Sequence, residues 1–83
     1  MQQKTKVAII SAMVTNPDSV ERLNAILHEY RSYIIGRMGL PYHKKSVSII
    51  SVAVDAKSDI INALSGKIGN LDGVSAKTVS SDI

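Results

Sequence analysis

The sequence predicts an α+β domain with the ferredoxin-like fold, in the element order β-α-β-β-α-β. Two observations support this prediction. Residues 7–14 and 47–54 are apolar stretches of strand length, and each is followed by a segment whose apolar residues recur at helical spacing. With short links and right-handed crossovers, this order favours a four-stranded antiparallel sheet with both helices on one face. The two most apolar strands, the first and the third, are expected at the centre.

The composition is typical of one small soluble domain spanning residues 1–83. Hydrophobic residues make up 45% of the 83 residues, and cysteine is absent, so disulfides cannot stabilise the chain. No stretch is long enough to span a membrane, which favours a cytoplasmic location. The net charge of +3 is spread along the chain, and the predicted strands lack the aromatic pairs used for base stacking. Direct nucleic-acid binding is therefore disfavoured.

The first strand, at residues 7–14, is apolar or small at both odd and even positions, as expected for a central strand covered on two sides. Asn16 is a suitable N-cap for the helix that follows, and Pro17 suits its first position. The helix presents one apolar stripe, which consists of Val20, Leu23, Leu27, Tyr30 and Ile34.

The second strand, at residues 34–40, contains Gly36 and Gly39, and glycine inside a strand marks a bulge or a close backbone approach. An edge position is therefore predicted. A turn at residues 41–45, with a basic tip at Lys44 and Lys45, leads to the third strand at residues 47–54.

The second helix, within residues 60–69, buries Ile61, Leu64 and Ile68, and Asp55 or Ser58 is expected to cap its start. Gly69 is predicted to adopt a left-handed conformation that ends this helix, because glycine accepts positive φ without steric cost. A turn at residues 71–74 leads to a last strand up to Val79, and residues 80–83 are expected to fray.

The first and third strands offer apolar residues to both sides of the sheet, whereas two helices cover only one side. An exposed aliphatic face is unfavourable in a stable monomer. The second face is therefore predicted to be buried in a homo-oligomer, either a dimer or a tetramer.

The sequence indicates no enzyme, no cofactor and no metal site. Ser65-Gly66-Lys67 lies near the end of a helix, whereas a phosphate-binding loop needs Lys and Ser/Thr at a helix start. His28 and His43 have no ligand spacing, although copies from different subunits could hold a metal. A metal-sensing module thus stays open as an alternative.

Three residues are candidates for ligand binding: Arg37, Asn16 and Gly39. Arg37 interrupts an apolar strand between two glycines, where its guanidinium could hold an anionic effector through two parallel hydrogen bonds. The alternative is an edge-strand arginine that discourages unwanted pairing or forms an ion pair between subunits. Asn16 lies in the loop between the first strand and the first helix.

Two motifs give the chain a family resemblance. Residues 35–41, with the pattern Arg-x-Gly-x-Pro, and residues 63–69, Ala-Leu-Ser-Gly-Lys-Ile-Gly, resemble the family of iron-only hydrogenase system regulators. This family is similar to ACT domains and to the nickel-binding C-terminal domain of the nickel repressor. The resemblance covers residues 7–79 and implies an oligomeric regulatory domain that responds to a small effector or a partner protein. An amino-acid-binding ACT domain is a further alternative, and the ACT loop that meets small effectors corresponds here to the loop holding Asn16. The nickel site requires cysteine, so it is not carried over.

Overall fold

A computed structural model describes residues 4–81 of the chain, and its elements alternate as β-α-β-β-α-β with two short 3₁₀ turns. The elements are β1 (Lys6–Val14), α1 (Asp18–Glu29), η1 (Arg31–Tyr33), β2 (Ile34–Tyr42), η2 (His43–Lys45), β3 (Val47–Ala56), α2 (Ser58–Gly69) and β4 (Val74–Ser81).

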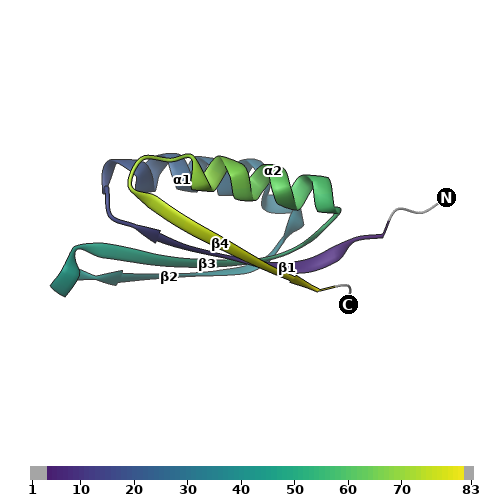
Figure 1. The fold of residues 1–83 in the computed structure, drawn as a ribbon, viewed down its shortest axis with the longest axis horizontal. Coiled ribbons are helices and arrows are strands. Elements are labelled where there is room, and N and C mark those ends of the chain that lie inside the picture. The colour runs from purple at the N-terminus through teal and green to yellow at the C-terminus, as the bar shows by residue number, and fades with distance from the viewer. Residues whose placement is uncertain (1–3, 82–83) are drawn as a thin grey trace.

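The four strands form one antiparallel sheet in the order β2-β3-β1-β4, and both helices lie on the same face of it (Figure 1). The ferredoxin-like fold and the central position of β1 and β3 are therefore confirmed. The molecule is elongated, 48 × 19 × 17 Å, because the long β2–β3 hairpin extends beyond the helices. Among the described residues, neither helix is long and apolar enough to cross a membrane.

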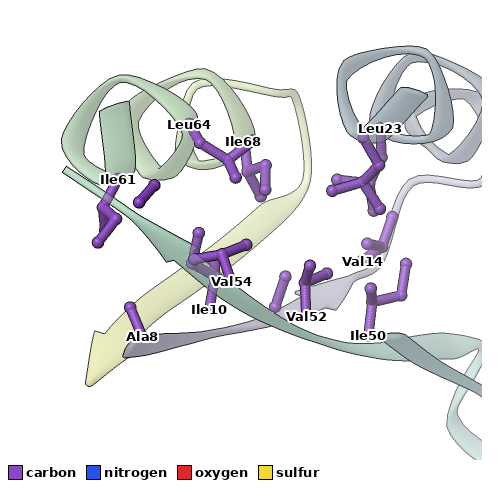
Figure 2. Packing of buried hydrophobic residues seen from close by; sticks show 13 residues of the cluster. Ala8, Ile10, Val14, Leu23, Ile50, Val52, Val54, Ile61, Leu64 and Ile68 are labelled. Atoms are coloured by element: carbon purple, nitrogen blue, oxygen red, sulfur yellow. The ribbon is translucent and has the colours of Figure 1, made fainter. Parts of the chain in front are cut away.

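The hydrophobic core lies between the helices and one face of the sheet. The even-numbered residues of β1 and β3 point to the helices, and Figure 2 shows Ile10, Val52 and Val54 directed toward α1 and α2. The helices contribute residues that the sequence predicted for their apolar stripes, among them the fully buried Leu23 and Leu64 and the almost fully buried Leu27. The remaining members of the core cluster are Ala8, Ala12, Val14, Ile50, Ala56, Ile61 and Ile68.

The start of α1 confirms the predicted cap. The Oδ1 atom of Asn16 accepts a hydrogen bond from the backbone N–H of Asp18 at 3.0 Å, and Pro17 already has helical φ and ψ of −59° and −26°. The helical turn that Asn16 caps therefore begins at Pro17, one residue before the first residue of α1, Asp18. The helix ends at Glu29, so Ile34 does not belong to its stripe; Ile34 begins β2, as the predicted strand at residues 34–40 has it.

Strand β2 lies at the edge of the sheet, as predicted, and its register shifts between Ile34 and Gly36, which leaves Ile35 as the extra residue of a bulge. The strand continues to Tyr42, two residues further than predicted, because Pro41 and Tyr42 keep their pairing with Ser48 and Val47.

Three predictions about α2 and β4 are wrong in detail. Gly69 is the last residue of α2, and the glycine with positive φ is Gly73, at 69°, in the turn that follows. Helix α2 begins at Ser58 after Lys57, with no side-chain cap, so neither Ser58 nor Asp55 has the predicted capping role. Ser80 and Ser81 belong to β4 rather than to a frayed tail, and residues 82–83 lie outside the described part of the chain.

Candidate functional site

The sheet face opposite the helices is uncovered by any described residue, and we call it the open face. Cα pairing places the odd-numbered residues of β1 and β3 on it, together with the even-numbered residues of β2 from Met38 to Tyr42. Several are large and exposed: Ile9 is 46% exposed, Met13 55%, Met38 54% and Leu40 55%. The open face consists of Val7, Ile9, Ser11, Met13, Met38, Leu40, Tyr42, Val47, Ile49, Ser51, Ala53, Asp55, Ser75, Lys77, Val79 and Ser81.

The open face has a small, polar centre between two apolar rows. Ser11 pairs with Ser51 across the two central strands, and Met38 and Lys77 stand at the ends of the same row, on β2 and β4. One row further along the strands lie Ile9 and Val79 in one direction, and Met13, Ile49 and Leu40 in the other. Hollows of about 380 and 260 Å³ flank the serine pair. These two hollows can receive side chains that protrude from a second surface.

Arg37, the first predicted ligand residue, lies on the other side of β2, toward α1. Its Nη2 atom donates a hydrogen bond to Oδ1 of Asn24 at 2.8 Å. Arg37 also lines a cleft of about 340 Å³ between α1 and β2, together with Asn24, Leu27, His28, Arg31 and Ile34. Gly39, another predicted ligand residue, lies in β2 two positions after Arg37 and pairs with Ile50 of β3.

Asn16, the third predicted ligand residue, ties the loop before α1 to the turn before β4. Its Nδ2 atom donates to Oδ2 of Asp72 at 2.7 Å, while its Oδ1 atom caps α1. The hydroxyl of Ser19, a buried polar residue, donates to the backbone oxygen of Asp72 at 2.6 Å. Asn24 stands eight residues along α1 from Asn16, about 12 Å at 1.5 Å per residue. The structure therefore does not bring Asn16 and Arg37 together.

The two histidines lie beside opposite ends of β2. His28 is in the last turn of α1, just before the strand, and His43 is in η2, just after it. A nine-residue strand spans about 30 Å. Within residues 4–81, no group of three or more His, Asp or Glu side chains could hold a metal ion.

Lys67, part of the rejected phosphate-loop motif, joins the two helices instead. Its Nζ atom lies 3.0 Å from Oε2 of Glu29 and 5.0 Å from the centre of the Tyr30 ring. The hydrogen bond to the Glu29 carboxylate is the main reason why the pKa of Lys67 is raised. Ser65 is also engaged, because its hydroxyl shares a hydrogen bond of 2.7 Å with that of Thr78.

The sequence indicated Arg37 as a candidate but did not place Asn24, His28 and Arg31 beside it. Asn24, His28 and Arg31 follow one another at spacings of four and three, so they share one face of the helix and the turn that continues it. That spacing was visible in the sequence. Which strand would lie beside this face was not, because it depends on how α1 crosses the sheet.

The fold and the open face define a small ferredoxin-like domain with one exposed apolar sheet surface. The TM1266-like family, described as "Iron-only hydrogenase system regulator, putative", matches residues 6–78. The chain belongs to this family, as its motifs predicted. It is similar to a solved structure, uncharacterized protein TM1266 from Thermotoga maritima, with 31% sequence identity and a TM-score of 0.88. The match covers 93% of this chain and 98% of that one. No curated protein matches the chain.

Proposed function

We propose that this chain is a non-enzymatic, cytoplasmic regulatory module of the iron-only hydrogenase system, that it works as a homo-oligomer, and that it responds to a small effector or a partner protein. The regulatory part is supported by the description of the family. The oligomeric part is supported by one observation: large apolar residues are exposed on the open face, among them Ile9, Met13 and Leu40.

A second copy of the chain fits the open face better than a partner of opposite charge. The described charged residues of this face are Lys77, on the edge strand β4, and Asp55, near the end of β3 opposite Val7, so their charges cancel. A two-fold interface brings a surface onto its own copy, so like charges near its centre would repel one another. A nearly neutral face avoids that repulsion and offers little to attract a strongly charged partner.

The position of Lys77 further favours one orientation of the two copies. A two-fold axis parallel to the strands and midway between β3 and β1 would place β4 of one copy over β2 of the other. Lys77 would then lie over Met38 of the second copy, since both belong to the row of Ser11 and Ser51. This packing keeps the two lysines apart and aligns the sheets, as in β-sandwiches.

The test is the assembly state of Ile9→Asp, measured by sedimentation velocity over a range of protein concentrations. We expect the wild-type chain to form dimers or larger assemblies and the variant to sediment as a folded monomer, because burying a carboxylate in an apolar interface is costly. Ala25→Asp is the matched control, since Ala25 is an exposed apolar residue of α1, on the other side of the molecule. A monomeric wild type, or an Ile9→Asp variant that assembles as wild type does, would refute the proposal.

A further inference from the structure

The cleft between α1 and β2 concentrates positive charge above an apolar floor. Arg31 and Arg37 approach it from η1 and from β2, and His28 approaches it from the last turn of α1. Leu27 is buried and Ile34 is half-buried, so these two residues form the apolar wall. The volume of about 340 Å³ lies within the range of small-molecule sites.

Both guanidinium groups are held in place by neutral acceptors. Nη1 of Arg31 donates to the backbone oxygen of His28 at 2.8 Å, and Nη2 of Arg37 donates to the side-chain oxygen of Asn24 at 2.8 Å. A guanidinium has five N–H donors, so each arginine keeps donors that these bonds do not use.

Within residues 4–81, neither arginine forms an ion pair with a carboxylate. The ion pair found among the described residues joins Lys67 to Glu29 and involves neither arginine. Glu29, the carboxylate nearest to the cleft along α1, is the one in that ion pair, and Asp18 and Glu21 line a separate cleft together with Arg22. Two unneutralised guanidinium groups beside one cavity repel each other, and a bound anion would relieve this repulsion.

We propose that this cleft binds a small organic anion whose carboxylate or phosphate group is held by Arg31 and Arg37, with its apolar part against Leu27 and Ile34. This inference rests on the effector-binding part of the proposed function and names the class of effector. Carboxylate and phosphate share the chemistry that the site recognises, since each offers oxygens that match the guanidinium fork. Asn24 acts as a positioning residue, because its side-chain oxygen fixes the Arg37 guanidinium at the edge of the cleft.

The experiment titrates the folded wild-type chain with inorganic phosphate and, separately, with succinate, while amide ¹H–¹⁵N spectra are recorded. Sodium chloride at matched ionic strength corrects for general screening. We expect saturable shifts centred on residues 24–37 with at least one of the two anions. Saturation with phosphate alone assigns a phosphate site, saturation with succinate alone assigns a carboxylate site, and saturation with both supports the shared chemistry.

Variants connect the binding to the cleft. Arg37→Gln and Arg31→Gln should each weaken the saturating anion at least tenfold. Arg37→Lys should fall between Arg37→Gln and wild type, because it keeps the charge but loses the planar fork. Arg22→Gln is the control: it removes an arginine from α1, the helix beside the cleft, at a position that lines another cleft. This variant should bind the anion as wild type does. If one of the two glutamine variants fails to fold, the other one alone tests whether the anion binds in this cleft.

The absence of saturable shifts in wild type with both anions would overturn the inference. So would unchanged binding in the glutamine variants. Sedimentation velocity on the same samples separates this result from the oligomer proposal: a chain that assembles but binds neither anion refutes the anion site alone, and a monomer that binds refutes the assembly alone.

Discussion

A Cβ atom built on Gly73 would stand 2.7 Å from the Cβ of Asn16, and 2.9 Å from its backbone nitrogen. The two residues are this close because the backbone oxygen of Gly73 accepts hydrogen bonds from both the N–H and the hydroxyl of Thr15, at 2.7 and 3.0 Å. The turn before β4 is therefore packed tightly against the end of β1, and its positive φ of 69° adds a second reason for glycine there.

Gly73→Ala is therefore expected to destabilise the fold by about 2 kcal/mol or more, because the methyl group clashes with backbone and the conformation is strained. Gly69→Ala is the matched control. It lies in the last turn of α2 with nothing within 4 Å of a built Cβ, so the free energy of unfolding should stay equal or rise slightly. Urea unfolding of both variants measures the difference, and equal values would contradict the assigned turn.

The parity of β1 predicts opposite behaviour of two adjacent isoleucines. Ile10 is 1% exposed and packs under the helices, so Ile10→Ala should cost about 2–5 kcal/mol. Ile9 is 46% exposed on the open face, so Ile9→Ala should cost much less in the folded monomer and should mainly weaken assembly. Chemical unfolding at low protein concentration, where the chain is monomeric, separates the two effects. Equal losses of stability would contradict the assigned faces of β1, and a larger loss for Ile9→Ala would mean that the faces are exchanged.

Asn16 and Asp72 predict a charge-repulsion experiment. Asn16→Asp keeps an oxygen that caps α1 but places a second carboxylate beside Asp72, at the position where Nδ2 now donates over 2.7 Å. We expect a loss of about 1 kcal/mol at pH 7, because a like-charge contact replaces a charge-assisted hydrogen bond.

Adding Asp72→Asn to Asn16→Asp exchanges the two partners and should restore most of that stability. A double-mutant cycle measured by thermal unfolding gives the coupling energy. Additive effects would show that the hydrogen bond between the two side chains contributes nothing.

The proposed packing of two open faces predicts that Met38 distinguishes the sign of an introduced charge. In that arrangement Met38 lies over Lys77 of the second copy. Met38→Lys should weaken dimerisation at least tenfold, about 1.4 kcal/mol, whereas Met38→Glu should weaken it less because it faces an opposite charge. Sedimentation equilibrium at low and high salt measures both variants. Equal weakening by Glu and Lys would exclude this orientation of the copies and leave other orientations of the same face.

Arg37 is expected to contribute little to the stability of the domain. Its side chain is exposed, and its described hydrogen bond goes to the equally exposed Asn24. Arg37→Gln should therefore change the free energy of unfolding by about 0.5 kcal/mol or less. Thermal unfolding checks this expectation, and a cooperative loss of structure would mean that the link between β2 and α1 supports the fold itself.

The sequence by itself determined the element order, the ferredoxin-like fold, the buried helix stripes and the edge position of β2. Each of these follows from local periodicity, from turn residues and from the rules for short connections, and none depends on distant contacts. The family was also visible in two short motifs, at residues 35–41 and 63–69.

The tertiary structure decided what local pattern left open. Because both faces of β1 and β3 are apolar, only the packed helices show that Ile10 is buried and that Ile9 lies on the open face. Gly69 and Gly73 are equally permissive in sequence, and only the structure shows that Gly69 stays in α2 while the turn before β4 gives Gly73 its positive φ. Arg37 faces Asn24 because strand pairing and helix crossing, which join residues 13 positions apart, place β2 beside α1. These contacts are non-local, and the sequence carries no periodic signal for them.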